Sequence, residues 1–171
     1  LQTNFSWVSL PAYGALRFVR SGGRGASPTC GRVSSGRRRG QAREVILVID
    51  TSGSMDGDSL TQAKSALSHA LRSFGEDDQF NLLQFNSTTE TLFDQSVVVT
   101  PATLYEAQLF ISSLKANGGT DMAPALKAAL AMPRNPQLMR QVVFITDGAV
   151  GNEADLLQMI AQDLGESRLF T

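Results

Sequence analysis

The stretch Glu-Val-Ile-Leu-Val-Ile-Asp-Thr-Ser-Gly-Ser, residues 44–54, decides the fold class of this chain. Residues 45–49 form a continuous apolar run rich in β-branched side chains, which is typical of a central parallel strand buried on both faces. A polar loop that starts with Asp50 follows at once. A second run of this kind, residues 141–146, also ends at an aspartate, Asp147. The sequence therefore predicts two buried strands, each with an acidic residue at its carboxyl end.

Strand and helix patterns alternate along the rest of residues 44–171. The expected elements are a helix capped by Asp58 and running to Phe74, a strand at Gln79–Phe85, short strands at Thr91–Phe93 and Val97–Val99, a helix from Thr100-Pro101 to Leu114, a helix from about Ala123 to Ala131, a helix over Ala154–Leu164 and a strand starting at Arg168–Thr171. This alternation predicts a Rossmann-like three-layer α/β fold, with a mostly parallel central sheet and helices on both faces. Ligands of such sheets lie beyond the carboxyl ends of the strands, so we expect the loops after Ile49 and Thr146 to converge.

Charge divides the 171-residue chain into two parts. Residues 1–43 contain eight arginines, no lysine and no acidic residue, and residues 44–171 contain seven basic and all 16 acidic residues, for a net charge of about −9. The Arg/Gly/Ser-rich segment 1–43 cannot bury enough apolar surface to offset chain entropy, so we expect it to be disordered or not native to the protein. Because no aromatic residues interleave with the arginines of Ser21–Arg43, a nucleic-acid partner is not expected.

Composition also bears on the setting of the chain. A single cysteine, Cys30, excludes an intrachain disulfide. No apolar run approaches the roughly 18 residues that a membrane span needs, and the N-terminus lacks the pattern of a signal peptide. The chain has no initiator Met, and its last expected strand stops at Thr171. We therefore expect a fragment whose domain, residues 44–171, is truncated at its C-terminus.

Five oxygen-bearing side chains are expected at the carboxyl ends of the buried strands. Alternation along an extended loop would place Asp50, Ser52 and Ser54 on one side. Thr120 adds a hydroxyl from a glycine-rich loop, and Asp147 adds a second carboxylate. This hard, all-oxygen set suits Mg²⁺, with Mn²⁺ or Ca²⁺ as alternatives. Since two acids and three hydroxyls do not fill an octahedron, at least one metal position is expected to stay open.

The same five residues resemble the metal-ion-dependent adhesion site, or MIDAS, of von Willebrand factor type A (VWA) domains. The family's Asp-x-Ser-x-Ser motif matches Asp50, Ser52 and Ser54, while its loop-two threonine corresponds to Thr120 and its loop-three aspartate to Asp147. The resemblance implies that the hydroxyls contact the ion directly or through water, with the aspartates held partly through water. It covers residues 44–171 and is nearest to the branch of inter-alpha-trypsin inhibitor heavy chains and bacterial surface proteins with VIT and VWA domains.

The resemblance implies a function in binding. A metal-dependent adhesion or protein-binding module, in an extracellular or cell-surface setting, would capture an acidic side chain of a protein partner at the open metal position. The charge of about −9 agrees with this, because such a domain repels an acidic partner unless a cation bridges the two. A purely structural VWA domain with an empty site is a second hypothesis.

Two enzyme classes fit the sequence less well. Gly57-Asp58-Ser59-Leu60 matches the nucleophile block of a lipase family, but those enzymes need a later Asp-x-x-His. The only histidine, His69, is not part of such a motif. A phosphohydrolase or phosphotransferase of the haloacid dehalogenase type would use Asp50 as nucleophile and Asp147 to bind Mg²⁺. That class needs an acid where this chain has Ser52, and a phosphate-binding lysine where only lysines on expected helices are available. We therefore assign no catalytic residue.

Overall fold

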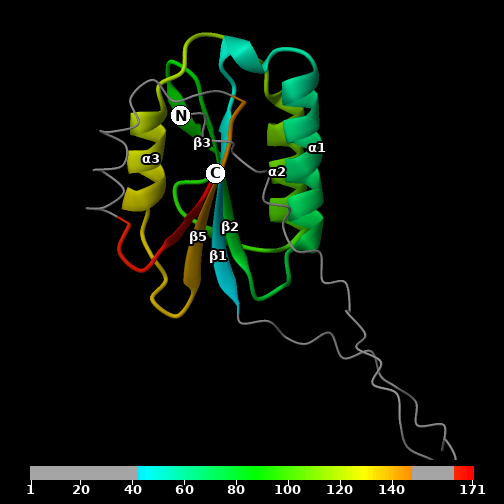
Figure 1. Cartoon of the computed structure of the whole chain (residues 1–171). Helices are drawn as coiled ribbons and strands as arrows, with labels where there is room; N and C mark the ends of the chain where they lie inside the picture. Colours follow the sequence, from blue (N-terminus) through cyan, green and yellow to red (C-terminus); the bar gives the residue numbers. More distant parts are fainter. Residues whose placement is uncertain (1–41, 148–163) are drawn as a thin grey trace, which may run out of the picture. The chain divides into compact units, whose positions relative to one another are not determined.

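The computed structural model describes residues 42–147 and 164–171, and it contains the α/β fold that the sequence predicts (Figure 1). The predictions for residues 1–43 and for a helix over Ala154–Leu164 lie outside this part except at their last residues. The described elements are β1 (Arg43–Asp50), a 3-10 helix η1 (Gly53–Met55), α1 (Asp58–Ser73), β2 (Gln79–Phe85), β3 (Thr89–Thr91), β4 (Val97–Val98), α2 (Pro101–Ser113), α3 (Met122–Ala131), β5 (Met139–Ile145) and β6 (Arg168–Phe170).

The strands form one mostly parallel sheet in the order β3-β2-β1-β5-β6, with β4 beside β2. β1 pairs in parallel with β2 on one side and with β5 on the other, and β6 continues in parallel from β5. Only β3 and β4 run antiparallel to β2. The strand order therefore reverses at β1, so the carboxyl ends of β1 and β5 are neighbours. Ligand sites in open α/β sheets lie at such a reversal.

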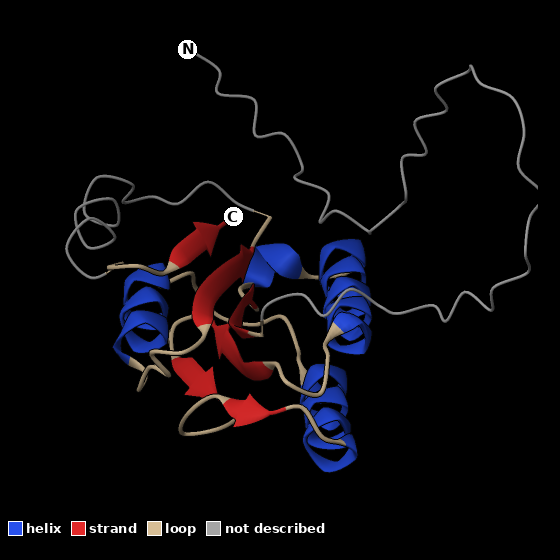
Figure 2. Cartoon of the chain, turned by 90° about the horizontal axis from the view of Figure 1, so that it is seen from below, coloured by secondary structure: helices blue, strands red, loops and turns tan. Residues whose placement is uncertain are grey.

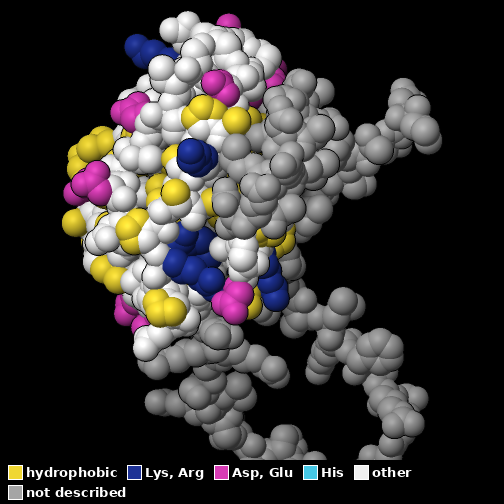
Figure 3. Space-filling model, turned by 90° about the vertical axis from the view of Figure 1, so that its left-hand side faces the viewer, with side chains coloured by type: hydrophobic (Ala, Val, Ile, Leu, Met, Phe, Trp, Pro, Cys, Tyr) yellow, Lys and Arg dark blue, Asp and Glu magenta, His cyan; other side chains and the backbone are white. Residues whose placement is uncertain are grey.

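Helices cover both faces of the sheet, as the sequence predicts (Figure 2). Val45, Leu47 and Ile49 of β1 pack in one apolar cluster with α1 and α2. Ile46 and Val48 point to the other face and pack with α3. All five side chains are buried, so β1 is the central strand covered on both faces. Viewed from the α3 side, the surface carries basic and acidic side chains close together among hydrophobic ones (Figure 3).

The predicted N-terminal cap of α2 is confirmed, whereas the predicted cap of α1 is wrong. Thr100 caps α2 with its side chain, which accepts a hydrogen bond from the backbone of Thr103, and Pro101 occupies the first turn. The cap residue of α1 is Gly57 rather than Asp58, because a φ of 82° turns the chain into the helix there. Asp58 is instead the first helical residue, where its negative charge favours the helix N-terminus.

Two strand predictions also need correction. β5 is not buried on both faces: Val142 and Phe144 are buried against the α3 side, while Val143 and Ile145 on the other face are only partly buried. The short strand expected at Thr91–Phe93 is β3 at Thr89–Thr91, two residues earlier in the chain. The side chain of Asn81 accepts a hydrogen bond from the backbone of residue 93, which replaces the ladder bond there. Among the described helices, none is long and apolar enough to cross a membrane.

Candidate metal centre

Asp50 is the last residue of β1, and its carboxylate is held between two loops. The side chain is almost completely buried, with 1% of the residue exposed. The backbone N–H of Ser52 donates to Oδ1 of Asp50 at 2.8 Å, and the Thr146 hydroxyl donates to Oδ2 at 2.8 Å. Both carboxylate oxygens therefore have a donor, and the carboxylate has one defined orientation.

The two serines of the loop after β1 meet the aspartate of the loop after β5. Ser52 Oγ and Ser54 Oγ lie 3.0 Å apart, and the Ser54 hydroxyl donates to Oδ1 of Asp147 at 3.0 Å. The expected convergence of the two loops is confirmed. The geometry behind it differs from the expected extended alternation, because residues 53–55 turn as a 3-10 helix that starts from Ser52. This turn brings both hydroxyls to one side.

Thr120 is positioned through the backbone of its loop. Gly53 N–H donates to the carbonyl of Gly118 at 3.0 Å, and Asn117 N–H donates to the carbonyl of Thr51 at 2.8 Å. Gly118 has a φ of 76°, a conformation that favours glycine. The Thr120 residue is exposed, and its side chain is not hydrogen-bonded to the other four predicted ligands, although all five are among the described residues. The structure thus joins the side chains of Ser52, Ser54 and Asp147, links Asp50 to them through the backbone N–H of Ser52, and holds the loop of Thr120 beside them.

Three residues that the sequence analysis missed support this arrangement. Thr146 orients Asp50, as described above. Ser87 Oγ accepts a hydrogen bond from Gly119 N–H at 2.8 Å, and the carbonyl of Asn86 accepts one from Asp121 N–H at 2.7 Å. Asn86 and Ser87 directly follow β2, so their position after a parallel strand was a signal that could have found them. Asp121 stands at the N-cap position of α3, but its side chain forms no cap hydrogen bond.

The chemistry of this donor set fits a hard divalent cation. Asp50 and Ser52 are buried, while Ser54 and Asp147 are exposed, so the set has a fixed inner part and an accessible outer part. Carboxylate and hydroxyl oxygens are the ligands that Mg²⁺ prefers. In residues 42–147 and 164–171, the ion pairs use Arg43, Arg134 and Arg140 only, and no basic side chain neutralises Asp50 or Asp147.

Sequence comparison identifies the class of protein. Residues 43–171 match the von Willebrand factor type A domain family. A von Willebrand factor A domain-containing protein of Dictyostelium discoideum is 36% identical over 132 residues, which is 77% of this chain. The chain therefore belongs to the von Willebrand factor type A domain family. It spans only 14% of the length of that relative.

Solved structures show the same fold. The von Willebrand factor type A protein from Catenulispora acidiphila matches with a TM-score of 0.68 and 23% identity, covering 75% of this chain and 32% of that one. The vWF domain of the type V pili tip protein Mfa5 from Porphyromonas gingivalis matches with a TM-score of 0.54 and 19% identity, covering 63% and 38%. Members of this family are generally protein-interaction modules.

Proposed function

We propose that this domain binds a protein partner through a divalent cation, with Mg²⁺ as the expected ion and Mn²⁺ or Ca²⁺ as alternatives. The ion would be held by Asp50, Ser52, Ser54, Thr120 and Asp147, and a carboxylate of the partner would complete its coordination. The ion supplies a positive charge that can accept an acidic ligand on a domain whose own net charge is about −9. This is a MIDAS-type site, and the place of the chain in the inter-alpha-trypsin inhibitor heavy chain-like branch stays a prediction.

One observation carries the proposal: Asp50 is a buried carboxylate whose two hydrogen-bond donors are both neutral. Buried charges in proteins are paired with an opposite charge or coordinate a metal. Among the described residues no basic side chain pairs with Asp50, and a second carboxylate, Asp147, connects to the same loop through Ser54. A bound cation would supply the missing positive charge, and the hydroxyls of Ser52 and Ser54 would add neutral ligands.

The same geometry argues against Asp50 as the nucleophile of a haloacid dehalogenase-type enzyme. Position 52, which would hold an acid in that class, is a serine whose hydroxyl lies against Ser54. The family match gives that alternative no support. We therefore propose binding rather than catalysis.

The cell surface is the setting we propose for this binding. It follows from the family resemblance, and the pilus tip domain among the structural neighbours supports it. Extracellular modules bind Ca²⁺ with dissociation constants of about 10⁻⁴ to 10⁻³ M, and a site with only two charged ligands suits that range.

Thermal unfolding of the 171-residue chain in Mg²⁺, Mn²⁺, Ca²⁺ or EDTA tests the proposal. A ligand that binds only the native state at about 100 times its Kd stabilises it by about 2.7 kcal/mol. For a domain of this size that corresponds to a Tm increase of roughly 5 to 10 °C. The double variant Asp50→Ala, Asp147→Ala should lose the increase.

A matched control removes two acids elsewhere. Glu76 and Asp77 are exposed in the turn before β2, at the opposite end of the sheet. The double variant Glu76→Ala, Asp77→Ala should keep the full metal-dependent increase in Tm. If folded wild-type protein shows no increase in any of the three metals, the domain is structural and the proposed function is wrong.

A further inference from the structure

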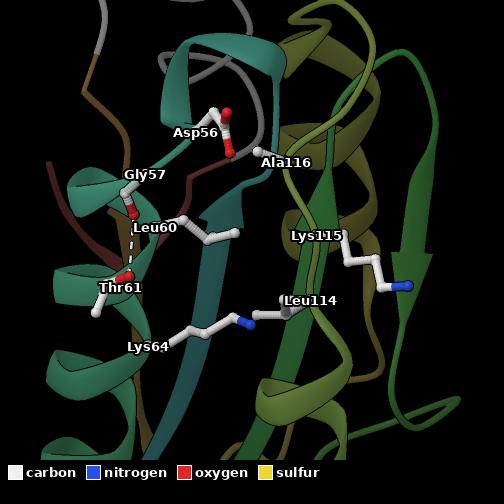
Figure 4. A pocket seen from close by; sticks show the side chains of 8 residues that line it. All are labelled: Asp56, Gly57, Leu60, Thr61, Lys64, Leu114, Lys115 and Ala116. Carbon is white, nitrogen blue, oxygen red and sulfur yellow. Dashed lines mark hydrogen bonds between the residues drawn. The ribbon is translucent and has the colours of Figure 1, made fainter.

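Two of the three lysines of this chain line a hollow next to the candidate metal centre. The hollow has a volume of about 350 Å³ and lies between the first turns of α1 and the segment that follows α2 (Figure 4). We call it the lysine groove and define it by Asp56, Leu60, Lys64, Leu114, Lys115 and Ala116.

The lysine groove adjoins the metal centre through both of its walls. Asp56 follows Ser54 by two residues on one wall. On the other wall, Ala116 precedes Asn117, whose N–H bonds to the carbonyl of Thr51 in the loop after β1. A ligand that reaches the metal centre from this side would therefore pass directly into the groove.

The positive charge of the groove is available to a ligand. Lys64 extends from α1 towards the opposite wall (Figure 4), and its Nζ donates one hydrogen bond to the carbonyl of Ser112 at 3.2 Å. An ammonium group has three donors, so two remain. Lys115 is exposed, and its ammonium group points away from α1 in the same view. Within residues 42–147 and 164–171, neither lysine takes part in an ion pair.

This arrangement contrasts with the charge of the whole domain. Residues 44–171 have only seven basic residues against 16 acidic ones. Arg134 and Arg140 are already in ion pairs. Lys64 therefore lies in the hollow and Lys115 at its outer edge, at the end of the molecule where the cation would bind, and neither has an acidic partner among the described residues. Charge complementarity makes an acidic ligand the best match for such a surface.

We propose that the lysine groove binds a second carboxylate of the same acidic partner segment whose first carboxylate reaches the metal. This inference rests on the proposed function and narrows it to a partner segment with two acidic residues. Asp56 sets their spacing, because its exposed carboxylate repels a second acid placed beside the metal-bound one. Lys64 follows Asp58, the first residue of α1, by six residues, which is roughly 9 Å along the helix axis. An extended peptide spans that distance in about three residues.

Blocked synthetic peptides test this on the full 171-residue chain in Mg²⁺. The diacid probe is acetyl-Asp, a spacer of roughly two to five glycines chosen from the extended-chain length, and a C-terminal Asp amide. The monoacid probe replaces the last Asp by Asn. Dissociation constants come from backbone amide NMR titrations, which also report whether each variant is folded. At low salt the best diacid should bind about three- to tenfold more tightly than its monoacid, because each exposed ion pair contributes little.

The double variant Lys64→Gln, Lys115→Gln should lose this difference and bind the monoacid as wild type does. Its matched control, Arg72→Gln with Lys127→Gln, removes two exposed positive charges on other helix surfaces and should keep the difference. Lys64→Arg with Lys115→Arg should also keep it. In about 1 M salt, where the Debye length falls to about 3 Å, wild type should lose most of it.

The outcomes separate the two proposals. If both probes bind wild type in Mg²⁺ and not in EDTA, but with equal affinity at every spacer length, the metal site stands and the lysine groove is wrong. If the Lys64→Gln, Lys115→Gln variant keeps the wild-type difference in affinity between the diacid and the monoacid, the lysine groove is likewise wrong and the metal site stands. If neither probe shows binding that EDTA removes, the proposed function itself is contradicted.

Discussion

Strand β1 carries a buried carboxylate near each end, and one has a charged hydrogen-bond partner whereas the other has only neutral ones. Glu44 and Asp50 lie six residues apart on the same face of the sheet, and both are at most 1% exposed. Glu44 faces Arg140 of β5, its direct neighbour in the register, through two hydrogen bonds of 2.8 and 2.9 Å. Asp50 accepts hydrogen bonds from a backbone N–H and a hydroxyl, both neutral.

This difference distinguishes two ends of the sheet. We call the end at Glu44 the closed end and the end at Asp50 the open end. Arg140 also donates to the carbonyls of Met132 and Pro133 just after α3, at 2.8 and 2.6 Å. Its guanidinium is therefore paired and hydrogen-bonded inside the protein. At the other end, Asp50 accepts from the backbone of Ser52, whose side chain leads through the exposed Ser54 to the exposed Asp147. The charge of Glu44 is neutralised by Arg140 within the fold, whereas the charge of Asp50 would be neutralised only by a bound cation.

The largest effect is expected from Glu44→Gln, which breaks the closed end. The substitution leaves the Arg140 charge buried without a partner and places an amide N–H₂ against the guanidinium. Removing one member of a buried ion pair costs about 3–5 kcal/mol. Urea unfolding should show this loss equally in Mg²⁺ and in EDTA. The double variant Glu44→Leu, Arg140→Met should recover a large part of it, and a loss below about 1 kcal/mol for Glu44→Gln would refute the contrast.

Asp50→Asn makes the matched change at the open end and should behave differently. The amide can keep the bond from Ser52 N–H and donate to the Thr146 hydroxyl, so no partner is lost. In EDTA we expect stability within about 1 kcal/mol of wild type, or higher, because a buried charge without a cation is removed. In Mg²⁺ the variant should lack the roughly 2.7 kcal/mol that metal adds at about 100 times its Kd.

Urea unfolding in both buffers measures these two values for Asp50→Asn. Asp121→Asn, which changes an exposed acid near the site to its amide, serves as the control and should keep most of the metal response. A large loss of stability for Asp50→Asn in EDTA would mean that Asp50 is a structural carboxylate like Glu44, and the two ends would then be equivalent.

The open end could be predicted from sequence to a larger extent than the closed end. The β-branched run before Asp50 and the run before Asp147 define two neighbouring strands, and a general property of α/β sheets brings the loops after them together. The Glu44–Arg140 pair joins residues 96 positions apart. It depends on the register between β1 and β5, which no local pattern in the sequence encodes.

Hydroxyl partners were harder to predict for a similar reason. Ser87 contacts the glycine loop only because the chain after β2 turns towards it. The direction in which Thr146 donates depends on its position opposite Asp50 at the ends of two paired strands. Residue type and spacing identified the acids and hydroxyls after β1, whereas the groups that orient them follow from the packed sheet.

The smallest effect is expected from Thr146→Val, which tests whether the orientation of Asp50 matters for the open end. Valine has nearly the same shape but removes the donor to Oδ2, leaving one oxygen of a buried carboxylate unsatisfied, at a cost of about 1–2 kcal/mol in EDTA. Loss of a group that orients a metal ligand lowers metal affinity by roughly 10- to 100-fold. Metal titrations followed by Tm should show this shift, and Thr146→Ser, which keeps the hydroxyl, should restore wild-type affinity. Equal metal affinity in Thr146→Val and wild type would mean that the loop after β1 alone orients Asp50, and the contact with β5 would then serve stability only.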